Sequence, residues 1–584
     1  MGNPSKCADA NFFRTTACTK TVLRALISLL ITSFASARGH SQSATSKPQQ
    51  DTCIVSGMVV KLAGSAPLKS ANVRLISIED RARAYSATTD GGGRFALKNV
   101  ERGRYRLRVR RNGFVTQEYG QKTPDDPGSI LTLAPGQEVK DLLFRLIPWS
   151  VIAGRIRDED GEPFPWIQVT ALREVYTDGK RKLSPDAQEI TNDLGEYRLF
   201  GLRPGRYFVS ATYSTRGQEL EQMSELAPAE ESAALGYVPT YYPGTPDPGR
   251  ASTITVKPGD EIPSVDILLQ RVAAYTIRGR IYNMIAHRPG KDVSIMMQPR
   301  NSKLAWTTFN FETTAQEKDG SFVLNHVIPG SYALLALWFD EGKQYLAKQN
   351  IDVGNADVVG VTLTIAPGVT VNGRVIWDGK PGLEGDELNI SAYPTEQSYY
   401  FGGDARVGPN GTFTLKEVPE DAYQLSVGGM SKDSYIKAVR YGTTDALYDG
   451  FTVERGTDAS LEVTLSSRGA RVQGTVTDAD SLPLAGVWVA LVPGEAHRGQ
   501  RKMYKETTTD QYGHFELRGV PPGDYNLFSW EEVEYGAWQD EEFLKPFEKK
   551  GQELKLQEGD KKNADLTAIK TKASEQENPL RRTT

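Results

Sequence analysis

Few side chains in this 584-residue sequence have the type and spacing that catalysis or metal binding requires. The five histidines, His40, His287, His326, His497 and His514, lack a glutamate three positions downstream, so no H-x-x-E pair of a zinc peptidase occurs. The sequence also contains no G-x-S-x-G, no phosphate-binding P-loop and no Cys/His nucleophile pair. We therefore expect neither an enzyme nor a resident metal or cofactor.

The acidic segment RDEDGE, which starts at Arg157, offers carboxylate oxygens of the kind that bind Ca²⁺. It lacks the downstream bidentate glutamate of a calcium-binding loop, and a related position near the C-terminus reads TDADSLPLAG. Asp and Gly are also favoured in turns, where they adopt the required backbone conformations. The segment is therefore predicted to be a hairpin-type turn between the first two strands of its domain.

Aromatic residues of the segment YVPTYYPGT are the best candidates for ligand binding. Tyr237, Tyr241 and Tyr242 lie on a Pro-rich stretch that is predicted to be an exposed loop, and flat aromatic faces suit sugars and peptides alike. Trp166 is a weaker candidate, as are Tyr399, Tyr400 and Phe401. The alternative is that these rings pack the loop onto its own domain or seal a contact between domains.

A sequence pattern that recurs five times indicates the strands that must position the candidate aromatic residues. It is exemplified by TNDLGEYRLFGLRPGRYFV at residues 191–209, in which a glycine is followed by an aromatic residue at +2, leucine at +4 and tyrosine at +12. The anchoring glycines are Gly93, Gly195, Gly320, Gly411 and Gly513, and the tyrosines are Tyr105, Tyr207, Tyr332, Tyr423 and Tyr525.

The spacing within the repeat predicts two half-buried strands joined as a β-hairpin. Side chains two residues apart share one face of a strand, so the aromatic residue at +2 and the leucine at +4 are expected to point inward together. A glycine at +10 is expected to form the turn, and Asp421, which replaces it in the fourth copy, is expected to distort that turn. The motif is therefore predicted to build a core, with its tyrosine inward.

A second glycine between apolar residues, such as Gly154 between Ile152 and Ile156, opens each repeat with a strand. Short strands with Gly/Pro turns at regular spacing predict an all-β fold of five tandem Ig-like or transthyretin-like β-sandwich domains, like beads on a string. The expected domains are 52–148, 149–272 with a loop insertion, 273–367, 368–468 and 469–571. Short helices are expected in that insertion, from Gln218, and from Asp540. Residues 572–584 are expected to be a disordered tail.

The N-terminus predicts export. Basic residues precede the apolar run ALISLLITSFASA, which ends in a small-x-small sequence at Ala37, so residues 1–37 are predicted to be a signal peptide and 38–51 a flexible linker. The alternative is an uncleaved membrane anchor. No later apolar run is long enough to span a membrane. Cys7 and Cys18 would leave with the signal peptide, and Cys53 is expected to act as a small hydrophobic residue at a strand start. A net charge of −4 excludes the basic surface of a nucleic-acid binder.

The repeat core and the segments SGMVV, AGRIRDEDGEPFP and QGTVTDADSLPLAGVWVAL resemble exported bacterial proteins built from tandem carboxypeptidase regulatory-like domains, which are related to transthyretin-like and starch-binding-like sandwiches. The third and fourth copies diverge most from this pattern. The resemblance implies a non-catalytic binding or scaffold protein in the periplasm, at the cell surface or outside the cell. Carbohydrate is the first ligand class that it implies. The alternative is a protein interaction or adhesion scaffold of the cell envelope without sugar binding.

Overall fold

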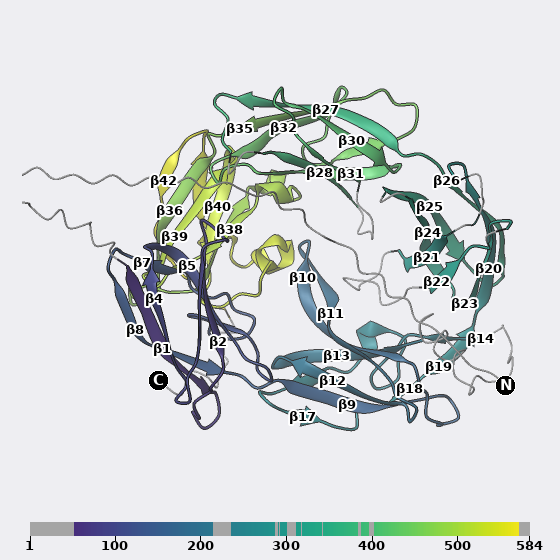
Figure 1. The fold of residues 1–584 in the computed structure, drawn as a ribbon, viewed down its shortest axis with the longest axis horizontal. Coiled ribbons are helices and arrows are strands. Elements are labelled where there is room, and N and C mark those ends of the chain that lie inside the picture. The colour runs from purple at the N-terminus through teal and green to yellow at the C-terminus, as the bar shows by residue number, and fades with distance from the viewer. Residues whose placement is uncertain are drawn as a thin grey trace, which may run out of the picture. The chain divides into compact units, whose positions relative to one another are not determined.

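The computed structural model describes residues 52–571, except for 214–234, 287–289, 291, 301–310, 317, 341–342, 384–386 and 396–401. The expected signal peptide, linker, C-terminal tail and insertion helix therefore lie outside the described residues. So do Tyr399, Tyr400 and Phe401. The fold is all-β and consists of five tandem sandwiches, which we number as modules 1 to 5 along the chain (Figure 1).

Module 1 shows the plan of the sandwich. One sheet has the strand order β4-β1-β8, and the other has the order β3-β2-β5-β6, with β7 also pairing with β5. Side chains of both sheets meet in one buried cluster, to which β1 contributes Val55 and β5 contributes Leu107. The strands of module 1 are β1 (Cys53–Lys61), β2 (Asn72–Ser77), β3 (Ala84–Thr88), β4 (Arg94–Val100), β5 (Gly103–Arg110), β6 (Gln117–Glu118), β7 (Leu131–Leu133) and β8 (Glu138–Leu146).

Module 2 repeats this plan with the sheets β12-β9-β17 and β11-β10-β13-β15, while β14 and β19 form a separate two-stranded sheet. Its elements are β9 (Ser150–Arg157), β10 (Gln168–Thr177), β11 (Lys180–Ile190), β12 (Glu196–Leu202), β13 (Gly205–Thr212), β14 (Leu235–Val238), β15 (Thr240–Tyr241), the 3-10 helix η1 (Pro248–Arg250), β16 (Ile254–Val256), β17 (Glu261–Ile262), β18 (Ile267–Leu268) and β19 (Gln270–Ala273).

Modules 3 and 4 have two sheets each, β23-β20-β26 with β22-β21-β24-β25, and β30-β27-β35-β32-β33 with β29-β28-β31-β34. The strands of module 3 are β20 (Tyr275–Asn283), β21 (Val293–Pro299), β22 (Phe311–Thr314), β23 (Ser321–Val327), β24 (Gly330–Asp340), β25 (Lys343–Val353) and β26 (Val358–Ile365). Those of module 4 are β27 (Val369–Asp378), β28 (Asn389–Pro394), β29 (Asp404–Arg406), β30 (Thr412–Val418), β31 (Asp421–Gly428), β32 (Tyr435–Tyr441), β33 (Thr444–Asp445), β34 (Phe451–Val453) and β35 (Leu461–Ser466).

Module 5 has the sheets β39-β36-β42 and β38-β37-β40-β41 and carries the described helices beyond η1. Its helix at Glu541 confirms the helical pattern expected from Asp540, although it is short. The elements are β36 (Ala470–Thr477), β37 (Trp488–Pro493), η2 (Glu495–His497), η3 (Arg501–Met503), β38 (Lys505–Thr508), β39 (His514–Val520), β40 (Gly523–Ser529), η4 (Ala537–Gln539), α2 (Glu541–Leu544), η5 (Glu548–Lys550), β41 (Gln552–Leu556), β42 (Lys561–Asn563) and β43 (Leu566–Thr567).

The two strands of the repeated motif do not form the hairpin that the spacing predicts. In module 2, β12 pairs with β9, whereas β13 pairs with β10 in the opposite sheet, and the same division holds in all five modules. The connection is therefore an arch that crosses the core. Side chains of both strands still point inward, which is why the alternation of apolar residues is the same for an arch as for a hairpin.

The recurring tyrosine anchors this arch in each module. Its ring is buried, and its hydroxyl donates a hydrogen bond to the carbonyl oxygen four residues earlier, in the connection itself. A tyrosine near a corner that bonds back to the backbone is also a feature of Ig-like sandwiches. The pairs are Tyr105–Glu101 (2.7 Å), Tyr207–Arg203 (2.9 Å), Tyr332–Ile328 (2.9 Å), Tyr423–Pro419 (2.8 Å) and Tyr525–Pro521 (2.9 Å).

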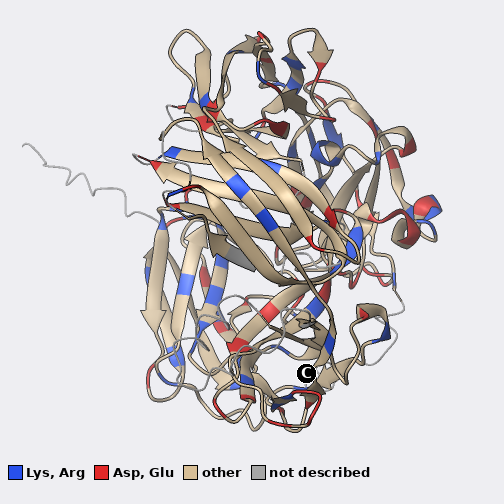
Figure 2. Cartoon of the chain, turned by 90° about the vertical axis from the view of Figure 1, so that its right-hand side faces the viewer, with Lys and Arg blue, Asp and Glu red and all other residues tan. Residues whose placement is uncertain are grey.

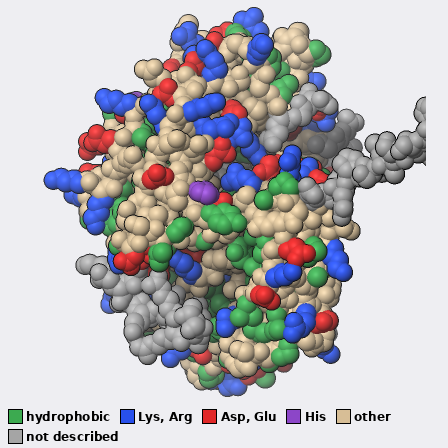
Figure 3. Space-filling view, turned by 90° about the vertical axis from the view of Figure 1, so that its left-hand side faces the viewer, with side chains coloured by type: hydrophobic (Ala, Val, Ile, Leu, Met, Phe, Trp, Pro, Cys, Tyr) green, Lys and Arg blue, Asp and Glu red, His purple; other side chains and the backbone are tan. Residues whose placement is uncertain are grey.

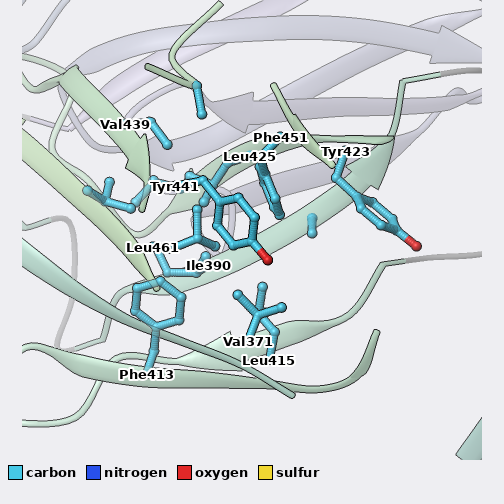
Figure 4. Close-up of a cluster of buried hydrophobic side chains, with 14 of the residues drawn as sticks. Val371, Ile390, Phe413, Leu415, Tyr423, Leu425, Val439, Tyr441, Phe451 and Leu461 are labelled. Atoms are coloured by element: carbon cyan, nitrogen blue, oxygen red, sulfur yellow. The ribbon is translucent and has the colours of Figure 1, made fainter. Parts of the chain in front are cut away.

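Asp421 does not distort the arch of module 4. It begins β31 as Gly103 begins β5, and it is not among the residues with positive φ. Tyr423 makes the same hydrogen bond as its counterparts. In Figure 4 its ring lies at one end of the buried cluster formed by both sheets, which includes Phe413 of β30 and Leu425 of β31. The expected distortion is therefore wrong, because Asp421 adopts an ordinary backbone conformation, as Gly330 and Gly523 do at the same position, although Gly103 and Gly205 have positive φ.

The anchoring glycine of each module does need a left-handed backbone conformation. Gly93 has φ +72°, and a Cβ atom at that position would lie 2.5 Å from the carbonyl oxygen of Val59. The other four anchoring glycines also have positive φ. The glycine that opens each module pairs directly across from the aromatic residue at +2 and has no room for a Cβ atom. That atom would meet a backbone carbonyl of the closing segment in modules 1, 2 and 5, and the aromatic ring in modules 3 and 4. The glycine–aromatic pairs are Gly57–Phe95, Gly154–Tyr197, Gly279–Phe322, Gly373–Phe413 and Gly474–Phe515.

Polar contacts join the modules to one another. Module 1 meets module 5 where the backbone of Thr132 bonds to the side chain of Gln511, and a β-bridge links Ile130 to Asp510. Ion pairs between modules include Arg203–Asp125 (3.1 Å), Arg181–Glu534 (3.3 Å), Lys348–Asp421 (2.9 Å) and Arg471–Asp433 (3.3 Å). Modules 1 and 2 are therefore each in contact with module 5, in addition to their neighbours in sequence.

Candidate functional site

Tyr237 lies in a group of rings that packs the insertion of module 2 against its sandwich. Its ring centroid is 4.8 Å from that of Phe164 and 5.7 Å from that of Tyr213. The guanidinium of Arg271 lies 4.9 Å from the ring centroid and donates a 2.7 Å hydrogen bond to the hydroxyl. Burial raises the pKa of Tyr237 to about 12, against the opposing effect of Arg271. The ring is half-buried, so only part of it faces solvent.

Tyr241 and Tyr242 differ from the expected exposed loop. Tyr241 belongs to β15, pairs with Ser210 of β13 and is only 4% exposed. Pairing with the edge of β13 satisfies backbone groups that a loop would leave to water, so the expectation that this stretch is not a strand is wrong. Tyr242 is half-buried against the core of module 2, and its N–H donates to the carbonyl of Val209 at 2.9 Å.

Trp166 is held next to the start of β10 in an unusual backbone conformation. Its φ is +62°, which is uncommon for a large residue, and its side chain is half-buried. The N–H of Trp166 donates to the carbonyl of Thr191 at 3.2 Å. Among the described residues, no ring contact joins Trp166 to the three tyrosines. Of the four candidate aromatic residues in module 2, Trp166, Tyr237 and Tyr242 therefore keep partly exposed side chains.

The RDEDGE segment forms a turn in which the carboxylate of Asp158 accepts hydrogen bonds from backbone N–H groups. The side chain of Asp158 accepts hydrogen bonds from the N–H groups of Asp160 (3.0 Å) and Glu162 (2.9 Å). Asp478 of module 5 accepts the same two bonds in the equivalent position. The turn does not lead into a hairpin as expected, because β9 and β10 belong to opposite sheets. Within the described ranges, no group of three His, Cys, Asp or Glu side chains could hold a metal ion.

Cys53 is the first residue of β1 and is fully buried, which confirms its expected role as a small hydrophobic residue. Its Sγ contacts the carbonyl oxygen of Ala134 at 3.0 Å.

Basic and acidic residues both occur across the strands and loops in Figure 2. In the part of the chain that the structure describes, no helix is long and apolar enough to cross a membrane.

Module 3 carries several exposed apolar side chains, on strands of both of its sheets. They include Tyr282, Met284, Phe339 and Val359, which are 50%, 62%, 64% and 68% exposed. Another face of the molecule also carries hydrophobic side chains in patches between charged groups (Figure 3). Surface of this kind offers contact area to a partner when it is contiguous.

A cavity of about 740 Å³ lies where module 4 meets module 5, and no sequence pattern predicts it. Module 4 contributes Tyr393 and Tyr448, and module 5 contributes Lys502 and Lys505. Lys502 lies on η3 and Lys505 begins β38. Lysines are usually solvated, so nothing in the sequence distinguishes these two from the other lysines of the chain.

The model of the carboxypeptidase regulatory-like domain matches residues 54–146 and 471–567. No curated protein matches the chain. Among solved structures, the Bacillus anthracis TIE protein is similar at 11% identity and a TM-score of 0.15, with 72% of this chain and 74% of that chain covered. GBS52, the minor pilin of Streptococcus agalactiae, is similar at 11% identity and a TM-score of 0.22, with 38% and 97% covered. Two B repeat units of the collagen-binding protein of Staphylococcus aureus are similar at 13% identity and a TM-score of 0.12, with 71% and 100% covered.

The matched ranges coincide with the strands of modules 1 and 5, from β1 to β8 and from β36 to β43. Modules 2 to 4 repeat the same arch, the same anchoring glycine and the same buried tyrosine. Modules 1 and 5 therefore match the carboxypeptidase regulatory-like domain, and modules 2 to 4 share its repeat.

Proposed function

We propose that this chain is an exported, non-catalytic binding scaffold of five sandwich modules, with boundaries near residues 148, 272, 367 and 468. The observation that carries this proposal is the use of the recurring residues. In every module the tyrosine hydroxyl bonds to the arch, and the carbonyl oxygen of the anchoring glycine accepts a hydrogen bond from the first strand of the module. The repeat therefore serves the fold, and binding is left to the surfaces that differ between modules.

Carbohydrate is the first ligand class, and module 2 is the first place to look for it. Trp166 and Tyr242 are half-exposed there, and aromatic faces with polar neighbours suit sugar rings. Arg271 and Glu159, which form a 2.9 Å ion pair beside Tyr237, supply such polar neighbours. Tyr241 is excluded from this role, because its ring is buried between Leu172 and Leu183.

A glycan array probed with the chain lacking residues 1–37 tests this proposal. Binding of at least one glycan is expected, and Trp166→Ala or Tyr242→Ala should weaken it. Phe200→Ala is the matched control, because Phe200 is an exposed aromatic residue of the same module, 52% exposed on β12. Failure to bind any glycan would remove carbohydrate as the ligand class. Fractionation of the producing cells tests export. The chain is expected outside the cytoplasmic fraction, and its N-terminal sequence should begin after Ala37.

A second candidate function is protein interaction, and the exposed apolar side chains of module 3 favour it. Tyr282 and Met284 follow one another closely at the end of β20, where they would lose surface to water on contact with a partner. Substituting both residues with Ser should abolish stoichiometric capture of an envelope protein by the chain. Capture that survives both substitutions would argue against this surface.

A further inference from the structure

The cavity between modules 4 and 5 has the size and lining of a small-molecule site. Its volume of about 740 Å³ falls within the range of roughly 300–1,000 Å³ that is usual for such sites. Tyr393 is 44% exposed, and Tyr448 is half-buried between the cores of the two modules. Ring surface is therefore present in the same cavity as charged groups.

The charge of the cavity is unbalanced. Lys502 and Lys505 are both half-buried, and neither forms an ion pair within 4.0 Å in the described part of the chain. The Nζ of Lys502 donates to the carbonyl oxygen of Leu447 at 2.9 Å, which is a neutral partner. The third cation at the cavity, Arg501, is already paired with Asp178 of module 2. Lys502 is thus left without an anion, and Lys505 has only the charge of Glu506, with which it forms no ion pair.

Burial makes this imbalance costly. Desolvation lowers the pKa of Lys502, and it lowers the pKa of Lys505 against a smaller opposing effect of Glu506. A partly buried charge that lacks an opposite charge destabilises the fold, and a bound anion removes that cost. Retaining two such lysines in one cavity is typical of a binding site, where stability is sacrificed for function.

The strands around the cavity favour a compact ligand over an extended peptide. Peptides commonly bind by adding a strand to an unpaired sheet edge. Strands β28 and β31, which supply the walls in module 4, each already pair with a strand on both sides. The edge strand β38 contributes only Lys505 to the cavity. Recognition must therefore come from side chains.

We propose that this cavity binds an acidic saccharide, whose carboxylates pair with Lys502 and Lys505 and whose sugar rings pack against the tyrosines. This inference rests on the proposed carbohydrate-binding function and names a ligand class for it, at a site separate from the aromatic residues of module 2. Each ammonium forms a charge-assisted hydrogen bond to a carboxylate oxygen, and such bonds are about twice as strong as neutral ones.

Calorimetric titration of the full chain with tetragalacturonate tests the inference. We expect binding, with an affinity about tenfold lower in Lys502→Met and in Lys505→Met, since tenfold corresponds to about 1.4 kcal/mol. Lys555→Met is the matched control, because Lys555 lies exposed on β41 of the same module. This variant should bind tetragalacturonate with unchanged affinity. Both cavity variants should melt at or above the wild-type temperature, so that lost binding is not explained by unfolding.

Two further ligands separate the possible outcomes. The methyl-esterified tetramer should bind about tenfold more weakly, because it lacks the carboxylates. Tetraglutamate that binds as tightly as tetragalacturonate would overturn the inference in favour of an acidic peptide. Unchanged binding of tetragalacturonate in both lysine variants would also overturn the inference. If Trp166→Ala loses the binding instead, the saccharide binds in module 2, and the proposed function remains supported. If tetragalacturonate does not bind while a glycan of the array does, this inference alone is wrong. If no saccharide binds at all, carbohydrate is also removed as the ligand class of the proposed function.

Discussion

The side chain of Gln511 in module 5 pairs with the backbone of Thr132 in module 1 as a neighbouring strand would. Its Oε1 accepts from the N–H of Thr132 at 2.9 Å, and its Nε2 donates to the carbonyl of Thr132 at 2.7 Å. The hydroxyl of Thr132 adds a 3.1 Å bond to Asp510. One glutamine therefore satisfies both backbone groups of a residue at the opposite end of the described sequence.

Gln511→Ala should loosen this contact between the first and last modules. Two hydrogen bonds are lost, each worth about 1 kcal/mol, so amide exchange at Leu131–Leu133 should become faster while the core of module 1 stays protected. Hydrogen exchange with mass spectrometry measures this. Gln188→Ala, at an exposed glutamine of β11, is the control. Equal protection in both variants would show that the two modules do not depend on this contact.

Replacing each recurring tyrosine with phenylalanine should destabilise its own module. Loss of the bond from the hydroxyl to the arch is expected to cost about 0.5–1.5 kcal/mol. Tyr207→Phe should cost the most, because the Tyr207 hydroxyl shares its proton between Arg203 and a carboxylate oxygen of Asp186 at 2.8 Å, and it also accepts from the N–H of Arg203 at 3.1 Å. Urea unfolding combined with segment-resolved hydrogen exchange assigns each loss to its module. Tyr282→Phe, at a residue 50% exposed, should change nothing.

Two nearby glycines provide a matched pair in module 1. Gly93→Ala should destabilise the module by more than about 1–2 kcal/mol, because it combines a left-handed backbone with a Cβ atom 2.5 Å from the carbonyl oxygen of Val59. Gly91→Ala should be near neutral, since its Cβ would meet nothing within 4 Å. Urea denaturation of the two variants measures the difference. Similar midpoints would contradict the role assigned to the anchoring glycine.

Acid should weaken the contact between modules 4 and 5. Arg518 and, to a smaller extent, Arg471 lower the pKa of Asp433. Because the folded-state pKa lies below the unfolded value of about 4, the stabilisation is complete above about pH 4 and is lost as the pH falls further through the folded pKa. Urea unfolding between pH 2 and 6 measures this. Asp433→Asn should be less stable than wild type at pH 6, and the difference should shrink at pH 2.

Alternation of apolar residues could predict the burial of the repeat but not its topology. Phe95 and Leu97 are buried as expected, at 5% and 2% exposure. The same alternation arises whether β4 and β5 share a sheet or face each other across the core, so the hairpin and the arch were indistinguishable from spacing. The tyrosine position was visible from its recurrence, whereas its hydrogen bond depends on the path of the arch.

The candidate site was harder to predict because it depends on contacts between distant segments. Tyr241 is buried because residues 240–241 pair with β13, and no local pattern signals that pairing. The cavity at Lys502 and Lys505 exists only where module 5 meets module 4. A sequence shows the residues of each module but not which of their surfaces come together.

The first strand of each module pairs in parallel with one of its last strands, as β1 does with β8, where Val59 lies opposite Phe144. A nascent chain therefore emerges with the central strand of this sheet long before its neighbour has been made. Until Phe144 is synthesised, β1 can pair only with β4, and half of its backbone groups remain available to other chains. Each module is thus exposed to mispairing during its own synthesis, five times in succession, and ends that vulnerable period only when its closing strand arrives.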